Sequence, residues 1–213
     1  MNLEGLLRGR QDIWRGRQGA AGHSVPSGFP ELDALLPGGG WPRGALVELL
    51  GEGATAGRIS LLLPALARLS RGKRWIAWVA PPHLPYAPAL VAAGIDLSRV
   101  LLVSPRAGAD GLWALEQALR SGTCSAVLAW PMAGDRARLR RLQLAAEAGD
   151  CLGFLFCPDH LRQQPSSARL RLQVRRAGGD LDVQVLKRPG PLPVPPVRLP
   201  LVPAGPVGAG IHH

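Results

Sequence analysis

The sequence reads ALVELLGEGATAGRISLLLPALARL over residues 45–69. Residues 45–50 form a short apolar run, which predicts a buried strand. A glycine-bearing loop, GEGATAGRIS, follows at residues 51–60, and residues 57–72 are long enough for a helix that ends at a glycine. A buried strand followed by a loop and a helix is typical of an α/β fold.

The same alternation of strand and helix continues along the chain to residue 156. Further apolar runs that predict buried strands lie at residues 75–79, 99–103, 125–130 and 152–156. Segments of the right length for crossover helices lie between them, at residues 84–94, 108–122 and 135–149. Because crossovers between parallel strands are right-handed, this order predicts a mostly parallel central sheet flanked by helices on both faces.

The C-terminal part of the chain has a different pattern. Residues 168–175 and 181–187 alternate apolar and polar side chains around the turn Ala177-Gly178-Gly179-Asp180, which predicts an antiparallel hairpin. From residue 189 onward the chain is rich in proline, and we expect it to run extended and to form neither sheet nor helix. The predicted organisation is a basic amphipathic helix and linker at 1–24, an α/β domain at 25–188 and a proline-rich extended tail at 189–213.

Composition limits the classes of function. The 213 residues are 46% hydrophobic and 19% charged, which is typical of a globular chain. No apolar run approaches the roughly 20 residues that cross a bilayer, so we expect no membrane partner. The three cysteines have no CxxC spacing, which favours a reducing, cytoplasmic location. A net charge of +10 favours a polyanionic or acidic partner.

The loop at residues 51–60 departs from a working P-loop, GxxxxGKS/T, in the positions that carry its chemistry. The glycines Gly51, Gly53 and Gly57 remain, but Arg58 stands in place of the lysine and an isoleucine in place of the hydroxyl that ligates magnesium. Trp130 stands where an aspartate is expected at the end of a later strand. We therefore predict a degenerate P-loop, no catalytic residues and no cofactor.

Several separated motifs carry a family resemblance. Residues 27–36, SGFPELDALL, and residues 37–50, PGGGWPRGALVELL, resemble the approach to the P-loop in RecA-like ATPases. Residues 13–16, IWRG, residues 61–66, LLLPAL, and the closing hairpin more closely resemble the ImuA family, which is related to SulA and RecA. The resemblance spans roughly residues 3–200 and implies a RecA-like core.

The resemblance also implies a function and partners. It suggests a non-catalytic accessory or adaptor protein of damage-induced translesion DNA synthesis, in a mutagenesis complex with a Y-family-like polymerase subunit of the ImuB type and an error-prone polymerase. RecA or its filament is a further expected partner. The alternative is a SulA-like cell-division inhibitor that binds the tubulin-like division protein. A degenerate but active ATPase that uses Arg58 and Ser60 stays open as a third interpretation.

Basic side chains are the candidate contacts for DNA or phosphate. They lie mainly on the hairpin and on the predicted helix at 135–149: Arg169, Arg171, Arg175, Arg176, Lys187, Arg188, Arg136 and Arg140. Alternation predicts that Arg169 and Arg171 share one face of a strand, opposite the leucines. Because no aromatic residues are interleaved with them, we expect any DNA binding to be weak and independent of sequence.

Apolar side chains at both ends of the chain are candidates for partner docking: Leu199, Leu201, Val202, Leu6 and Trp14. The first three make the proline-rich tail more apolar than a spacer needs to be, and extended proline-rich segments bind grooves at low entropic cost. Leu6 and Trp14 lie on the N-terminal amphipathic helix, which packs on its own domain or docks a partner. Cys151, Cys157 and His160 lack the spacing of a zinc site, so we predict no metal.

Overall fold

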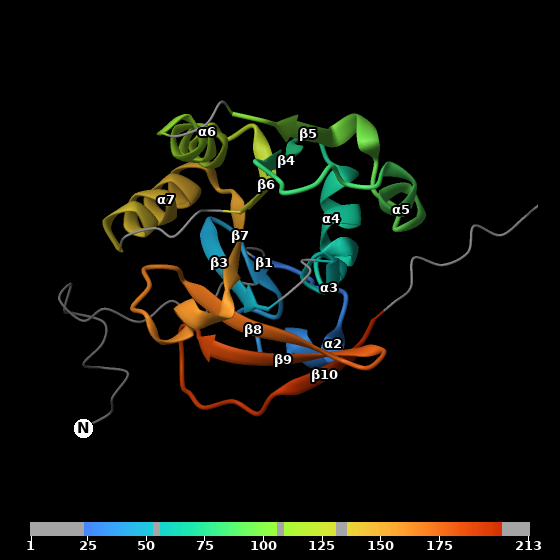
Figure 1. Ribbon diagram of the computed structural model, residues 1–213, viewed down its shortest axis with the longest axis vertical. Helices are drawn as coiled ribbons and strands as arrows, with labels where there is room; N and C mark the ends of the chain where they lie inside the picture. The colour runs from blue at the N-terminus through green and yellow to red at the C-terminus, as the bar shows by residue number, and fades with distance from the viewer. Residues whose placement is uncertain (1–23, 53–55, 106–108, 131–135, 202–213) are drawn as a thin grey trace, which may run out of the picture.

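The computed structural model describes residues 24–52, 56–105, 109–130 and 136–201 (Figure 1). The predicted N-terminal helix, with Leu6 and Trp14, therefore lies outside the described residues. In chain order, the elements are β1 (Ser24–Val25), α2 (Pro30–Asp33), β2 (Trp41–Pro42), β3 (Ala45–Gly51), α3 (Ala56–Ser60), α4 (Leu63–Ser70), β4 (Trp75–Val79), α5 (Ala87–Ala92), η1 (Leu97–Arg99), β5 (Val100–Val103), α6 (Ala109–Arg120), β6 (Cys124–Ala129), α7 (Arg136–Gly149), β7 (Leu152–Pro158), η2 (Asp159–Gln163), β8 (Leu170–Ala177), β9 (Asp180–Lys187) and β10 (Val197–Pro200).

An eight-stranded sheet forms the centre of the molecule, with the strand order β10-β9-β8-β3-β7-β6-β4-β5. The strands from β8 to β5 in this order run parallel to one another, and β9 and β10 continue the sheet antiparallel beyond β8. The predicted α/β class is confirmed, with its large, mostly parallel sheet and its antiparallel C-terminal end. Every residue of β3 is buried, because β7 and β8 pair with it on either side and a core covers each face of the sheet there.

Helices cover both faces of the sheet, as Figure 1 shows. Successive side chains of a strand point to opposite faces, so β3 contributes to two separate cores. Val47 and Leu49 pack in one core together with residues of α2, α4 and α5. Leu46 and Leu50 pack in the other, together with residues of α6 and α7. Among the described helices, none combines the length and the hydropathy that crossing a bilayer requires.

The strand predicted at residues 99–103 is present as β5, but it is not buried. It is the last strand in the sheet order, and Leu101 and Leu102 are each 44% exposed. A local apolar run indicates a strand, whereas its place in the sheet depends on pairing with distant segments. The expectation that this strand is buried was therefore wrong.

The expectation that the proline-rich segment forms no sheet was also wrong. Residues 197–200 form β10, which pairs antiparallel with β9 in the register Val197↔Val183 to Pro200↔Asp180. An edge strand needs ladder hydrogen bonds on one side only, so it tolerates proline. Leu199 is fully buried and therefore cannot serve as the docking residue that the sequence suggested. Leu201 packs half-buried against the same core, and Val202 lies outside the described residues.

Candidate functional site

Arg58 occupies the position that a P-loop lysine would take, and its side chain is buried. It stands on α3, directly after the loop that follows β3, and Gly53 of that loop lies outside the described residues. The Nη1 atom of Arg58 donates to the backbone oxygens of Leu49, at 3.0 Å, and Cys157, at 2.8 Å. The side chain therefore links α3 to β3 and β7.

The surroundings of Arg58 explain how a buried cation is tolerated there. Burial lowers the pKa of its guanidinium, and the neighbouring Cys157 and Asp159 act in the opposite direction. The guanidinium carbon also lies 5.9 Å from the ring centroid of Phe156, within the range of a cation–π interaction. Backbone oxygens and an aromatic face thus replace the phosphates that a P-loop cation would contact.

An aromatic stack lies at the carboxyl ends of the neighbouring strands. The ring of Trp130, which follows β6, is 4.6 Å from that of Phe156 on β7, with an interplanar angle of 9°. On its other side it is 5.8 Å from the ring of Trp78 on β4. Carboxylate and water oxygens are the ligands that magnesium requires. Trp130 places a stacked indole, which is not a magnesium ligand, at the position where an aspartate was expected.

Arg171 forms a buried ion pair with Glu48, so its assignment to an exposed DNA-contacting face was wrong. The two residues are partners in the register of β3 and β8, and their side chains are 4% and 8% exposed for Glu48 and Arg171 respectively. Arg171 Nε donates to Glu48 Oε2, and its terminal nitrogens donate to backbone oxygens of residues 161–164. Ser166 donates to the other carboxylate oxygen of Glu48 at 2.9 Å.

The remaining basic candidates do not form one basic surface. Arg169, Arg175, Arg176 and Arg140 are exposed, and the side chain of Arg136 lies outside the described residues. Arg175 and Arg176 are consecutive on β8, so they point to opposite faces of the sheet. Two further candidates bind backbone oxygens: Lys187 donates to Ser166 and Arg188 donates to Leu35 and Pro191. Direct DNA contact through the exposed arginines stays a prediction.

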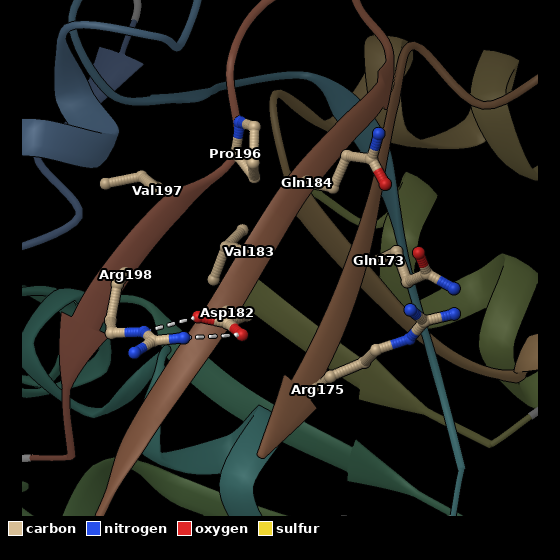
Figure 2. A pocket seen from close by; sticks show the side chains of 8 residues that line it. All are labelled: Gln173, Arg175, Asp182, Val183, Gln184, Pro196, Val197 and Arg198. Carbon is tan, nitrogen blue, oxygen red and sulfur yellow. Dashed lines mark hydrogen bonds and ion pairs between the residues drawn. The ribbon is translucent and has the colours of Figure 1, made fainter. Parts of the chain in front are cut away.

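A hollow of about 420 Å³ lies on the antiparallel part of the sheet. Figure 2 shows the side chains that line it, including Arg175 and Arg198. Arg198 makes two hydrogen bonds to Asp182, at 2.8 and 3.2 Å, which lower the pKa of that carboxyl. Arg175 lies 3.7 Å from Asp159. Both exposed arginines therefore have an acidic neighbour within the protein.

A group of exposed apolar side chains lies between β4 and β5, and the sequence analysis missed it. Four residues form what we call the α5 surface: Leu84, Tyr86, Val91 and Leu97, which are 80%, 73%, 54% and 38% exposed. They stand on the loop before α5, on α5 itself and on η1. Isolated exposed apolar residues are ordinary, whereas several on consecutive elements indicate an interaction surface. The prolines around Leu84 and Tyr86 were the one indication of this surface in the sequence, because they prevent the segment from forming a regular amphipathic helix that would bury its apolar side chains.

The three cysteines are free and buried, and we expect them to be unreactive in the folded protein. Burial raises the pKa of the Cys157 thiol to about 12 and also raises the pKa of Cys124 and Cys151. Because the thiolate is the reactive form, a disulfide reagent at pH 8 should titrate no thiol before denaturation and three afterwards. Rapid titration of any thiol in the native protein would contradict this burial.

Among the described residues, no group of three potential metal ligands is present.

Comparison with known proteins identifies the family to which this chain is related. The family model described as "Cell division inhibitor SulA" matches residues 45–153, which include the strands β3, β4, β5 and β6 and the α5 surface. The cell division inhibitor SulA of Edwardsiella piscicida is 38% identical over 118 residues, covering 55% of this chain and 70% of the relative.

Two other relatives match at lower identity and over a smaller share of their own length. The protein ImuA of Caulobacter vibrioides is 33% identical over 61% of this chain and 55% of its own. The protein RecA of Lactobacillus delbrueckii is 30% identical over 60% of this chain and 37% of its own. The predicted relation to SulA and RecA is confirmed, although ImuA is not the name that the matches support best. The chain belongs to the family of the cell division inhibitor SulA.

Proposed function

We propose that this protein is a cell-division inhibitor of the SulA type, which binds the tubulin-like division protein and performs no catalysis. This was the alternative in the sequence analysis, and the family match now favours it over the translesion adaptor. The α5 surface is the observation that carries the proposal. It lies within the matched residues 45–153, and an inhibitor that acts by binding needs an exposed surface of this kind.

The chemistry of the α5 surface suits a protein partner. Tyr86 offers a large apolar ring with a hydroxyl group, and Leu84 and Val91 offer aliphatic area beside it. Aromatic residues are enriched among the side chains that dominate binding energy at protein interfaces. Arg99 stands on η1 together with Leu97, and its guanidinium carbon lies 5.9 Å from the Trp75 ring centroid.

The proposed absence of catalysis rests on Arg58 and predicts a binding result. Nη1 of Arg58 donates to the backbone oxygens of Leu49 and Cys157, and we infer that this anchored side chain does not serve a bound phosphate. We expect calorimetric titration with Mg-ATP to show no saturable binding. Saturable binding that the substitution Arg58→Ala abolishes would contradict the proposal and would support the active-ATPase interpretation.

Overproduction in a bacterial host tests the division role. We expect induced cells to elongate into filaments without septa, whereas cells with an empty vector divide normally. Western blotting establishes that the full chain accumulates. Cells that accumulate folded protein and keep their normal length distribution would contradict the proposed function.

A second candidate is the adaptor role in translesion synthesis, and one feature favours it. Residues 154–201, which include β8, β9 and β10, lie beyond the part of the chain that the SulA model matches. This extension adds surface to the part of the chain that matches SulA, and a different partner would have room to bind there. Co-purification with the Y-family-like polymerase subunit of the same host, at moderate salt and without nucleotide, tests this role. Because β10 belongs to the sheet, the test uses the full chain rather than one ending at residue 188.

A further inference from the structure

A short basic run lies at the end of α4 and in the turn that leads to β4. Residues 68–74 read Arg-Leu-Ser-Arg-Gly-Lys-Arg, with four basic residues and no acidic one. Basic runs of this kind are one of the sequence signals for a surface that binds nucleic acid. The sequence analysis placed its candidate DNA contacts on the hairpin and on α7 and did not include this turn.

Three of these basic side chains are free cations. Arg68, Arg71 and Lys73 are exposed, and within the described part of the chain none of them makes an ion pair. Arg74 differs, because it forms an ion pair with Asp150 at 3.5 Å. The turn therefore presents positive charge that no acidic side chain of the described residues neutralises.

The fold brings a further cation and an aromatic ring to this turn. The hydroxyl of Ser70 accepts the N–H of Asp96 at 3.0 Å, which joins the end of α4 to the segment before β5. Arg99 donates to the backbone oxygen of Lys73 at 3.4 Å, and its guanidinium carbon lies 5.9 Å from the Trp75 ring centroid. Trp75 begins β4, which pairs side by side with β5 (Figure 1), and it is 39% exposed. We call Arg68, Arg71, Lys73, Trp75 and Arg99 the basic turn surface.

Acidic side chains are scarce around the basic turn surface. The segments that meet here are residues 68–75, 95–100 and 121–124, and they contain one acid, Asp96. Its carboxylate accepts the N–H of Ser98 at 2.9 Å. Because four cations stand against this single carboxylate, the surface carries an excess of positive charge, and such an excess favours a polyanion.

The aromatic ring indicates which polyanion fits. Unpaired bases stack on aromatic rings and on guanidinium planes, and every base can do so because every base has a π-face. The ring of Trp75 and the guanidinium of Arg99 offer both kinds of plane beside the free cations. The bases of a duplex are already stacked within the helix, and an acidic polypeptide has no bases, so these two polyanions would use the cations alone.

We propose that the basic turn surface binds single-stranded nucleic acid, with phosphates at Arg68, Arg71 and Lys73 and a base at Trp75. Contacts to phosphates and π-faces make this binding independent of base sequence and sensitive to salt. The inference goes beyond the proposed division role and does not depend on it, since Arg71 and Lys73 lie outside the α5 surface.

Fluorescence anisotropy of a labelled oligothymidylate strand, titrated with the full chain at several salt concentrations, tests the cations. Each phosphate contact to a single strand contributes about −0.7 to the slope of log K against log salt concentration. The variant Arg71→Ala/Lys73→Ala should therefore raise the dissociation constant and make the slope shallower by about 1.4. Arg169→Ala/Arg176→Ala is the matched control, because it removes the same charge from exposed positions outside the surface, and it should keep the slope. An unaltered chain that does not bind at low salt, or equal changes in the two variants, would overturn the proposal.

Photochemical cross-linking tests the contact with Trp75 and needs no substitution. A strand that carries 5-iodouracil should cross-link to Trp75 when the complex is irradiated, because this base reacts with the aromatic ring on which it stacks. Peptide mapping by mass spectrometry locates the cross-link. Trp113 on α6 is the internal control, since it is 65% exposed but stands outside the surface. Cross-linking at Trp113 with none at Trp75 would contradict the proposed site.

Competition distinguishes the possible polyanions. At equal charge concentration, unlabelled oligothymidylate should displace the labelled strand better than either a DNA duplex or polyglutamate does, because only the single strand offers bases for stacking. Equal displacement by polyglutamate would assign the surface to an acidic protein segment and overturn the proposal. Equal displacement by the duplex would remove the role of Trp75 and contradict binding of single strands in particular.

Discussion

Replacing Arg171 with leucine is expected to lower the free energy of unfolding by about 3–5 kcal/mol, the cost of leaving one member of a buried ion pair without its partner. The Glu48 carboxylate would keep the hydroxyl of Ser166 but lose its cation. The backbone oxygens within residues 161–164 would lose their donors at the same time. Urea denaturation followed by circular dichroism measures the change.

Arg175 provides the matched control for this prediction. It lies on the same strand, but its side chain is 59% exposed, and its acidic neighbour Asp159 is 3.7 Å away. Exposed pairs of this kind contribute about 0–1 kcal/mol, so Arg175→Leu should change the stability little. Arg171→Lys should fall between the two, because lysine keeps the charge but lacks the planar fork. Similar stabilities for the leucine variants would show that the Glu48 pair contributes little.

The double substitution Leu84→Ser/Tyr86→Ser is expected to abolish the division block while leaving the protein folded. Both side chains are more than two-thirds exposed, at 80% and 73%, so their removal costs little stability. Truncating an apolar anchor of an interface costs about 2 kcal/mol or more, which is at least about 30-fold in affinity. The lengths of cells that overproduce each variant measure the effect.

The control for the double substitution is Leu144→Ser. This leucine is 48% exposed and stands on α7, which covers the other face of the sheet from α5. It should cause filamentation as strongly as the unaltered chain does. If the double variant and the control block division equally, the α5 surface is not the site that binds the division protein.

The sequence predicted the parts of the fold that depend on local pattern. The apolar run at residues 45–50 identified the central strand, because a strand covered on both faces needs apolar residues in succession. Glu48 interrupts that run, and a carboxylate there requires a buried cation. That cation, Arg171, lies 123 positions away in the sequence, so the local alternation of β8 indicated an exposed residue instead.

The features that the sequence did not predict depend on how distant segments pair. Residues 197–200 contain little that indicates a strand, and they form one because β9 offers them an unpaired edge. The exposure of β5 follows from its place at the end of the strand order. The α5 surface was missed for the same reason, since its apolar residues become a surface only when no other element covers them.

Sedimentation of the nucleotide-driven polymers of the tubulin-like division protein, with and without this chain, tests the central claim most directly. The account predicts that increasing amounts of the purified chain remove polymer from the pellet until none remains. It also predicts that the Leu84→Ser/Tyr86→Ser variant leaves the pellet unchanged. Polymer that sediments in full at a molar excess of the folded, unaltered chain would contradict the account.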